Sequence, residues 1–419
     1  MPFQPRIAIV GGGPSGLALG LLLRQRGLYP TIYELRNKMT PEELAKPSGV
    51  LDLHEESGLM VMRECGLWDE FQASTGDCSE ECRVLDPQGN VLHTDKGELS
   101  TRPEISRHAL TTILMKNIPS NSIKWNQKIT AVRDARNTTT GAVEITLDLG
   151  VNSTATYDFV VGADGAWSRV RKLLTDAKPF YTGAQYVTAT LRHASTKFPH
   201  LAELSGSGAF LALGGGKGIL SHRGPQDSIR VCAAVNTPHE DWVKVAGLEG
   251  KTTAEVKTAL LGDENLFAKW APELQDLFAT ACDEETKDNG GPADILPLYS
   301  LPIGTRWEYR TGATLIGDAA HLMTPWAGEG VNLALWDSLD LAHALAAVPE
   351  AEDAAAWQAA LEPRIREFEE TMATRTKEKA EETAKNQKMF LSENGGQVLA
   401  DMFKMYEKMA AAGGPPGKR

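Results

Sequence analysis

The sequence predicts an α/β protein in which a parallel sheet carries an inserted antiparallel sheet and is followed by a long helical segment. Three observations lead to this prediction. Residues 6–35 contain an apolar strand, a glycine-rich turn, a helix and a second strand, which is the pattern of a βαβ unit. Residues 185–236 alternate in polarity between glycine-rich turns, as antiparallel strands do. Residues 357–409 are rich in Glu, Lys and Ala, which favour helix.

The other elements are predicted from composition and periodicity. Strands are expected over residues 84–86 and 91–94 as a hairpin, and over 123–132, 143–149 and 157–162. Antiparallel strands are expected over 185–193, 209–213, 218–222 and 229–236, and a strand of the first sheet over 314–317. Helices are expected over 107–118, 252–280 and 329–347, and one long helix from 357 to about 409.

Length and charge bound the function. A chain of 419 residues suggests two or three domains. The net charge of −12 argues against binding to nucleic acid or to an anionic membrane surface. No apolar run is long enough to span a membrane, and Ile7–Val10 is too short for a signal peptide. We therefore expect a cytoplasmic protein without a membrane partner.

The first glycine-rich turn has the pattern G-x-G-x-x-G. Gly11 permits the tight turn, Gly13 lets a pyrophosphate approach the backbone, and Gly16 lets the helix pack on the strand. The amide groups at the start of the helix then bind phosphate. Glu34 follows the second strand, 18 residues after Gly16, where a carboxylate accepts hydrogen bonds from ribose hydroxyls. The alternative is a glycine-rich loop with Glu34 as a surface acid.

A second turn about three hundred residues later fits the other end of such a ligand. Asp318 directly follows the expected strand 314–317, where its carboxylate meets ligand hydroxyls. Pro325, Gly328 and Gly330 then lead into a helix, and the glycines let the backbone lie flat against a planar ligand. The positive end of that helix stabilises negative charge on a reduced flavin. Two such turns indicate a flavin rather than a nicotinamide dinucleotide.

Three further residues leave two interpretations open each. Asp164 follows the apolar strand 157–162 and either faces a ligand or closes an Asp-Gly turn. Arg107 either reaches a phosphate or is a surface arginine. His321 is either a general base or a histidine bonded within the strand-to-helix crossing. The second interpretation of His321 is favoured, because no orienting carboxylate stands at a recognisable spacing.

The segments GGGPSG, YDFVVGADGAWSRVRK and GDAAHLMTPWAGEGVN, in this order and at these separations, resemble the class A single-component flavin monooxygenases. These enzymes share the fold of para-hydroxybenzoate hydroxylase, and the resemblance covers nearly the whole chain. Within them, the segments GVLDLHEESGL and RPEISRHAL and the long C-terminal helix look most like the tetracycline-inactivating monooxygenases, the tetracycline destructases.

The resemblance implies a Rossmann-like FAD-binding domain of the glutathione reductase type, with an inserted substrate domain. The FAD-binding domain would comprise residues 1–80, 104–178 and 290–356, and the substrate-binding domain residues 81–103 and 179–289. Residues 357–412 would form a C-terminal bridging helix, and residues 413–419 a disordered tail.

The resemblance also implies noncovalent FAD and names the residues around it. The ADP half would be held by Gly11, Gly13, Gly16, Glu34, Leu35 and Arg36. Arg107 would contact the phosphate or ribityl region, and Asp164 would lie in the crevice that FAD and, transiently, NADPH occupy. The ribityl chain and ring system would meet Asp52, Asp318, Pro325, Gly328, Gly330, Val331 and Asn332. Thr188, Arg230 and Trp326 would contact the substrate.

The implied chemistry belongs to the cofactor, so that no catalytic side chain and no metal are expected. NADPH reduces the flavin, O₂ gives a C4a-hydroperoxide, and one oxygen atom passes to a phenolic or polycyclic aromatic substrate, tetracyclines included. The chain departs from the destructases in the inserted sheet, which lacks their polar Gln and His around residues 186–191 and 228–232. Thr324 and Trp326 also replace their Pro and Phe.

Other functions remain open. The same fold supports epoxidation or Baeyer–Villiger oxygen insertion in secondary metabolism. A protein of another class would carry flavin and sequester a ligand without turnover. Substrate-dependent NADPH oxidation discriminates these. The cysteines, among them Cys78 and Cys82 in a C-x₃-C arrangement, are expected to be thiols rather than zinc ligands, because no second ligand pair lies nearby. A monomer is expected from the resemblance.

Overall fold

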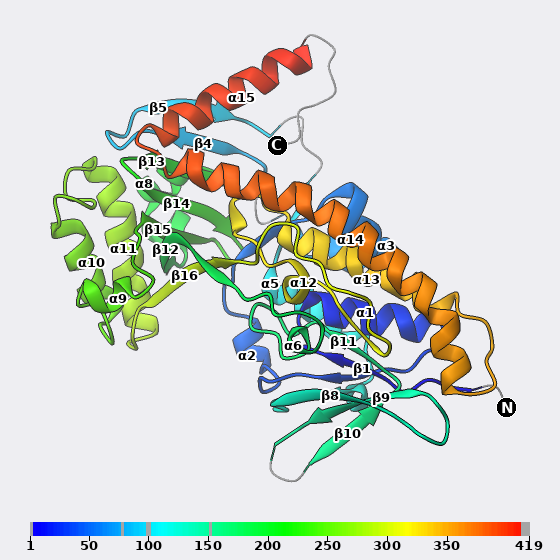
Figure 1. Cartoon of the computed structure of the whole chain (residues 1–419). Coiled ribbons are helices and arrows are strands. Elements are labelled where there is room, and N and C mark those ends of the chain that lie inside the picture. The colour runs from blue at the N-terminus through cyan, green and yellow to red at the C-terminus, as the bar shows by residue number, and fades with distance from the viewer. Residues whose placement is uncertain (1–2, 77–78, 98–101, 151–152, 412–419) are drawn as a thin grey trace.

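The computed structural model describes residues 3–76, 79–97, 102–150 and 153–411. Figure 1 shows a parallel sheet at one end, a larger antiparallel sheet at the other, and α14 (Ala354–Phe390) running along both. Cys78 and the expected tail 413–419 lie outside the described residues. Within the described part of the chain, no helix is long and apolar enough to cross a membrane.

The parallel sheet has five strands in the order β17-β11-β1-β2-β7. Its strands are β1 (Ile7–Val10), β2 (Thr31–Tyr33), β7 (Ile123–Lys124), β11 (Phe159–Gly162) and β17 (Ala313–Leu315). Ile9 at its centre is paired with Val161 on one side and Ile32 on the other, and all three side chains are fully buried. Such apolar runs are typical of a sheet covered on both faces. The predicted βαβ unit and the late strand of this sheet are confirmed.

Helices cover one face of this sheet and a small antiparallel sheet covers the other (Figure 1). On the helical side, α1 (Pro14–Gln25) packs against α5 (Arg107–Lys116) and against α13 (Gly330–Ala346). The small sheet contains β8 (Ala131–Arg136), β9 (Val143–Asp148) and β10 (Thr154–Tyr157). Ile145 and Leu147 of β9 are fully buried in the same core as Phe159.

The antiparallel sheet has seven strands in the order β16-β12-β15-β14-β13-β4-β5. They are β4 (Cys82–Leu85), β5 (Val91–Asp95), β12 (Phe180–Leu191), β13 (Ala209–Gly214), β14 (Lys217–Gly224), β15 (Ser228–Asn236) and β16 (Asp294–Ser300). One face packs on α8 (Pro199–Ser205), α10 (Thr253–Gly262) and α11 (Pro272–Asp288). The residues alternating with these, such as Ala184 and Tyr186, belong to a second core with the C-terminal helices. The same core also contains Trp326.

The remaining elements are short. They are β3 (Val50–Asp52), which pairs with β6 (Glu104–Ser106), and the helices α2 (Pro41–Leu44), α3 (Met60–Glu64), α4 (Trp68–Gln72), α6 (Arg171–Leu174), α7 (Ala194–Lys197), α9 (Trp242–Val245) and α12 (Asp318–His321). Three further turns of helix are η1 (Glu55–Leu59), η2 (Ser120–Ser122) and η3 (Pro325–Ala327).

Several predicted elements are wrong in extent. The strand expected over 123–132 breaks at Asn126, whose φ is 55°, so that β7 and β8 join different sheets. The helix expected over 252–280 is two helices, because Pro272 starts a new one. Residues 294–300 pair with β12 as an edge strand of the antiparallel sheet, although the predicted boundary at residue 290 assigned them to the FAD-binding domain.

The C-terminal segment is also divided. The single helix expected over 357–412 consists of α14 and α15 (Gly395–Ala411). Gly396 allows the start of α15 to approach the sheet, since a Cβ there would lie 2.6 Å from the carbonyl oxygen of Leu85. Only α14 bridges the two parts of the molecule, whereas α15 packs on β4, β5 and β13.

Candidate active site

The first glycine turn combines close packing with open space. A Cβ on Gly11 would lie 2.0 Å from the carbonyl oxygen of Ala163, and a Cβ on Gly16 would lie 2.0 Å from that of Gly11. These two positions therefore require glycine for packing. Gly13 differs, because a Cβ there would have no neighbour within 4 Å. Gly13 is the N-cap of α1, and no side chain caps this helix. The first amide groups of α1 are therefore free to bind a ligand in the open space beside Gly13.

Glu34 lies directly beside this turn. Its carboxylate accepts hydrogen bonds from the backbone N–H of Gly12 at 2.7 Å and from that of Arg36 at 2.8 Å. The side chain of Leu35 is exposed, as is that of Arg36. The structure thus brings the acid predicted for a ribose to the glycine turn. Contact of Leu35 and Arg36 with a ligand stays a prediction.

Asp318 and Arg107 come from distant segments, and the charge of each affects the pKa of the other. Asp318 is accessible to solvent, yet protein surrounds it closely enough that burial raises its pKa, against the opposing effects of His321, Arg107 and Arg171. The Arg107 side chain is likewise accessible, and burial lowers its pKa while the Asp318 carboxylate raises it. Both side chains are thus open to solvent while protein atoms surround them closely. Two opposite charges in such surroundings suit a ligand that carries hydroxyls and phosphates.

The second glycine turn reaches the strand pair β3–β6. Gly328 has a φ of 67°, and a Cβ there would lie 3.2 Å from Oδ1 of Asp52. The buried side-chain amide of Asn332 holds this turn against the segment 52–54. Its Nδ2 donates a hydrogen bond to the carbonyl of Asp52 at 2.9 Å, and its Oδ1 accepts one from the N–H of His54 at 2.9 Å. A Cβ on Gly330 would meet nothing within 4 Å. The turn therefore leaves open space at the start of α13, as the one at Gly13 does for α1.

Both open ends belong to one continuous region. Ser338 of α13 donates a hydrogen bond to the carbonyl of Ser15 at 2.9 Å, and a Cβ on Gly317 would lie 3.2 Å from Oγ of Ser15. Gly330 precedes Ser338 by eight residues of α13, which is about 12 Å along the helix axis. We call the surface bounded by Gly13, Asp52, Arg107, Asp318 and Gly330 the cofactor region. Its length and open glycines fit an extended dinucleotide.

A buried chain of charged side chains adjoins this region, and no motif in the sequence marks it. His54 has a side chain that is 2% exposed; its Nε2 lies 2.8 Å from Asp52 and its Nδ1 3.5 Å from Glu329. Glu329 is in turn paired with Lys379 of α14. Burial alone would lower the pKa of His54, but the two carboxylates raise it to about 8. His54 and Lys379 together lower the pKa of Glu329 to about 2.

The raised pKa of His54 makes protein stability depend on pH. The folded protein binds this proton more tightly than the unfolded chain, so the stabilisation is complete below about pH 6.5 and is lost as the pH rises through about 8. The loss amounts to roughly 2 kcal/mol of unfolding free energy. We expect urea unfolding between pH 6 and 9 to show this decrease in the wild type and a flatter profile in His54→Gln. The exposed His200 supplies the control, since His200→Gln should keep the wild-type profile.

His321 has the carboxylate that sequence spacing did not reveal. Its Nε2 lies 2.6 Å from Oδ2 of Asp337, a fully buried residue of α13. The same carboxylate accepts the N–H of Gly317 at 2.9 Å and, through Oδ1, a bond of 2.9 Å from Arg375. The favoured interpretation, a histidine bonded within the crossing, is consistent with this network. The assumption that no carboxylate orients His321 is wrong.

Asp164 is engaged within its own turn. Its carboxylate accepts the Ser168 hydroxyl at 2.5 Å and the N–H of Arg169 at 2.6 Å. Arg171 is buried rather than solvated and donates to the carbonyl of Ala319 at 2.9 Å, which ties this turn to α12. The geometry therefore agrees with the Asp-Gly turn, and a contact of Asp164 with FAD or NADPH stays a prediction.

The residues predicted to meet the substrate separate into two groups. Thr188 donates to Asp294 at 2.6 Å and accepts a bond of 3.0 Å from Arg230, and the Arg230 charge is close enough to lower the pKa of Arg107. These polar groups of the antiparallel sheet thus border the cofactor region. Trp326 is only 7% exposed. Its ring packs edge-on against Tyr186 and Phe390, so it shapes the wall between sheet and helix α14.

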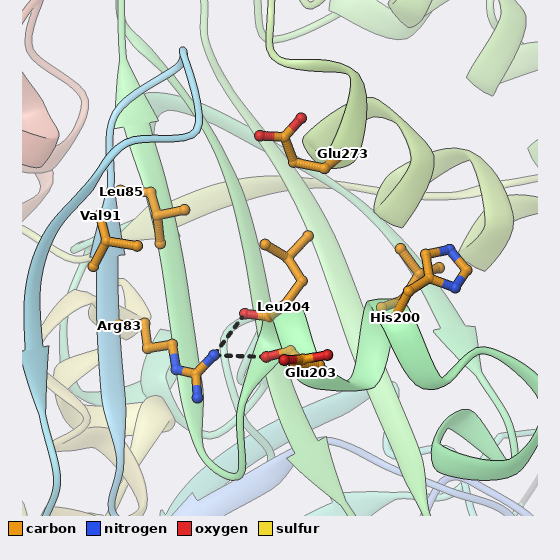
Figure 2. A pocket seen from close by; sticks show the side chains of 8 residues that line it. Arg83, Leu85, Val91, His200, Glu203, Leu204 and Glu273 are labelled. Atoms are coloured by element: carbon orange, nitrogen blue, oxygen red, sulfur yellow. Dashed lines mark hydrogen bonds between the residues drawn. The ribbon is translucent and has the colours of Figure 1, made fainter.

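A separate cavity of about 400 Å³ lies on the helix-covered face of the antiparallel sheet. Figure 2 shows it between β4, β5, α8 and α11, with Arg83 donating to the carbonyls of Glu203 and Leu204. Leu85 and Leu201 in its wall belong to the core on that face. None of the predicted cofactor or substrate residues lines it, and we assign it no role in the active site.

Comparison with known proteins agrees with this geometry. The family described as FAD binding domain matches residues 5–207 and 225–372. Monooxygenase penA of Penicillium thymicola is 32% identical over 432 residues, which cover 95% of this chain and 98% of that protein. This chain therefore belongs to the FAD binding domain family and is an enzyme of the FAD-dependent monooxygenase class, with FAD as its cofactor.

Solved structures share the fold over almost the full length. Klebsiella pneumoniae HpxO complexed with FAD and uric acid has a TM-score of 0.73 at 20% identity, covering 98% of this chain and 96% of that chain. The tetracycline destructase Tet(55) has a TM-score of 0.67 at 18% identity, with 99% of each chain covered. The predicted para-hydroxybenzoate hydroxylase type of fold is confirmed. The likeness to the destructases is one of fold alone.

Proposed function

We propose that the protein uses NADPH and O₂ to hydroxylate a phenolic or polycyclic aromatic compound. The observation that supports this proposal is that Gly13 and Gly330, both open, begin two helices that pack together, while the charge of Arg230 on the antiparallel sheet acts on Arg107. The cofactor would thus lie with its reactive end between α13 and a wall able to hold a substrate. Tetracyclines are one candidate class within this proposal.

Each part of the cofactor region would have its own task. The amide groups at the start of α1 bind the pyrophosphate, and Glu34 binds the ribose of the ADP half. Asp318 accepts the ribityl hydroxyls, and Arg107 holds a phosphate. Gly328 and Gly330 let the backbone lie against the ring system, while Asn332 keeps that turn in place through its bonds to β3 and η1. Bound FAD supplies the redox chemistry, and no side chain needs to act as a nucleophile.

The substrate wall is polar at one corner and aromatic at another. Arg230 offers donors to a phenolic oxygen or a carbonyl, and Asp294 balances the arginine charge at 3.6 Å while it accepts the Thr188 hydroxyl. Tyr186 is closely surrounded, and burial raises the pKa of its hydroxyl, so the ring stays neutral. Such a wall suits a planar substrate with one oxygenated edge. It also helps to exclude water from the reacting atoms.

The direct test is purification followed by a substrate screen. The protein should contain FAD, and NADPH consumption should rise with the correct compound among phenols, anthraquinones and tetracyclines. Mass analysis should show a product heavier by one oxygen atom, and its structure separates hydroxylation from epoxidation or ring insertion. A ligand that binds tightly without accelerating NADPH oxidation would contradict turnover and favour a sequestering protein.

Glu34→Ala should weaken FAD binding through its ADP half. Loss of the carboxylate removes the ribose contact and the bond to Gly12, so we expect the dissociation constant of FAD to rise about tenfold. Fluorescence titration of the apoprotein measures this. Affinity for FMN, which lacks the AMP part of FAD and hence this ribose, should not change, and an equal loss for FMN would contradict the assignment.

Asp318→Ala should weaken FAD binding through the ribityl chain. The change removes an acceptor and leaves Arg107 and Arg171 without the carboxylate that balances them. We expect at least a tenfold rise in the dissociation constants of both FAD and FMN. Asp134→Ala, which alters an ion pair on the outer β8 strand, is the control. Wild-type flavin content in the Asp318 variant would contradict the role.

A further inference from the structure

The proposed hydroxylation consumes one proton in each turnover. NADPH supplies a hydride, one atom of O₂ enters the product, and the other leaves as water after taking up the hydride-derived hydrogen and a proton. A site that excludes water must still deliver this proton. The inference that follows rests on the proposed function and concerns the groups able to supply it.

The buried chain described above has one end that opens on the cofactor region. The Asp52 side chain is 31% exposed, and its carboxylate reaches the turn at Gly328. His54 behind it is almost inaccessible, with one ring nitrogen facing Asp52 and the other facing Glu329. The Glu329–Lys379 pair lies on the other side of His54 from Asp52 and lines a second cavity of about 570 Å³ beside α14. A proton on Nε2 of His54 can therefore reach the cofactor region by way of the Asp52 carboxylate.

We propose that the His54–Asp52 pair stores a proton for the reaction and releases it into the cofactor region, with Glu329 and Lys379 holding the imidazole in place. Asp52 is the group that faces the reacting atoms. His54, Glu329 and Lys379 are positioning residues, since they act through it.

The charges around His54 support storage. Asp52 and Glu329 face it from β3 and from the start of α13, and Arg102 opposes its protonation from the segment before β6. Lys379 faces Glu329 and is itself balanced by Glu382. These are three carboxylates against the two positive charges of Lys379 and Arg102, which leaves room for one more positive charge, and protonated His54 supplies it. The pKa of about 8 means that the proton is present at neutral pH and can still be released.

Proton transfer begins at His54. The Nε2–H bond of its protonated ring breaks and an O–H bond forms on Asp52, while the Nδ1–H bond remains directed at Glu329. Asp52 passes its proton to an acceptor in the cofactor region and becomes a carboxylate again. After the product has left, a hydronium ion from the solvent gives a proton through Asp52 to Nε2 and becomes water, which restores the starting state.

The first experiment measures storage without turnover. The full-length, FAD-loaded protein labelled at the histidine ring carbons is titrated by NMR, with the His54 signal assigned by its loss in His54→Gln. We expect a midpoint near pH 8, displaced to lower pH in Glu329→Gln because a stabilising carboxylate is removed. His200→Gln is the matched control and should leave the His54 midpoint unchanged. A His54 midpoint at or below its ordinary value would overturn the proposal.

The second experiment measures coupling to the cofactor. The midpoint potential of bound FAD is recorded against pH by equilibrium reduction with reference dyes. Negative charge added on reduction raises the pKa of a nearby imidazolium, so reduction should take up an extra proton above about pH 8 and the plot should steepen there. The steepening should vanish in His54→Gln and persist in His200→Gln.

The outcomes separate the two proposals. Steepening that survives in His54→Gln overturns proton storage, even when FAD binds and a substrate is oxygenated. Failure of the protein to bind FAD, or to oxygenate any compound, overturns the proposed function instead. Asp52→Asn, which keeps the shape of the side chain but cannot relay a proton, should move the steepening to lower pH together with the His54 midpoint, because one of the two carboxylates that raise this pKa is lost, and it should slow turnover of any compound that the wild type oxygenates.

Discussion

Gly13→Val is expected to release FAD from a protein that still folds. The backbone of Gly13 has a φ of −75°, which valine accepts, and a Cβ there meets no protein atom within 4 Å. The added side chain therefore collides only with a ligand that occupies the open space. We expect the dissociation constant of FAD to rise at least a hundredfold, which is about 2.7 kcal/mol of binding energy. Fluorescence titration and the thermal midpoint of the apoprotein are the measurements.

Gly330, at the other end of the cofactor region, is open in the same way. Gly330→Val should weaken the binding of both FAD and FMN, because it obstructs the ring system that they share. Gly262→Val is the matched control: its Cβ would also meet nothing within 4 Å, but it lies at the end of α10. Full FAD affinity in both Gly13→Val and Gly330→Val would refute the placement of the cofactor.

Asp337→Ala is expected to cause the largest loss of stability. Asp337 is fully buried, and its removal leaves His321, Arg375 and the N–H of Gly317 without their shared acceptor. Breaking such a buried charge network costs about 3–5 kcal/mol. Urea unfolding of the apoprotein measures the change directly.

Asp340 provides the control for this variant. It also pairs with Arg375, at 2.8 Å, but its side chain is 31% exposed. Because water replaces the lost partner of an exposed pair, Asp340→Ala should cost less than about 1 kcal/mol. Equal losses in the two variants would show that burial of Asp337 does not set its contribution.

Local features explain why much of the cofactor region was predictable. A G-x-G-x-x-G turn between a strand and a helix is recognisable because the glycines that it needs lie close together in the sequence. The structure shows that a Cβ on Gly11 or Gly16 would clash with the backbone. Gly328 likewise adopts the positive φ that favours glycine. Glu34 was predictable because the length of the intervening helix fixes where the second strand ends.

Element boundaries were less predictable, although some signals were present. Pro272 marks the start of α11, and Gly395 with Gly396 marks the start of α15. Residues 294–300 join the antiparallel sheet through β12, and Pro297 is tolerated because β16 is an edge strand. Pairing between strands a hundred residues apart leaves no periodic trace, so the sequence could not show which sheet this segment would join.

The sequence by itself determined the class of cofactor and the two glycine turns that we propose to bind it, since each turn depends on the backbone freedom of a few adjacent residues. Only the tertiary structure decided which charges are paired behind those turns. His54 meets Glu329, and His321 meets Asp337 and Arg375, through the packing of α13 and α14. Such pairs are set by how buried helices meet, because burying a charge requires a partner in space whatever its distance along the chain.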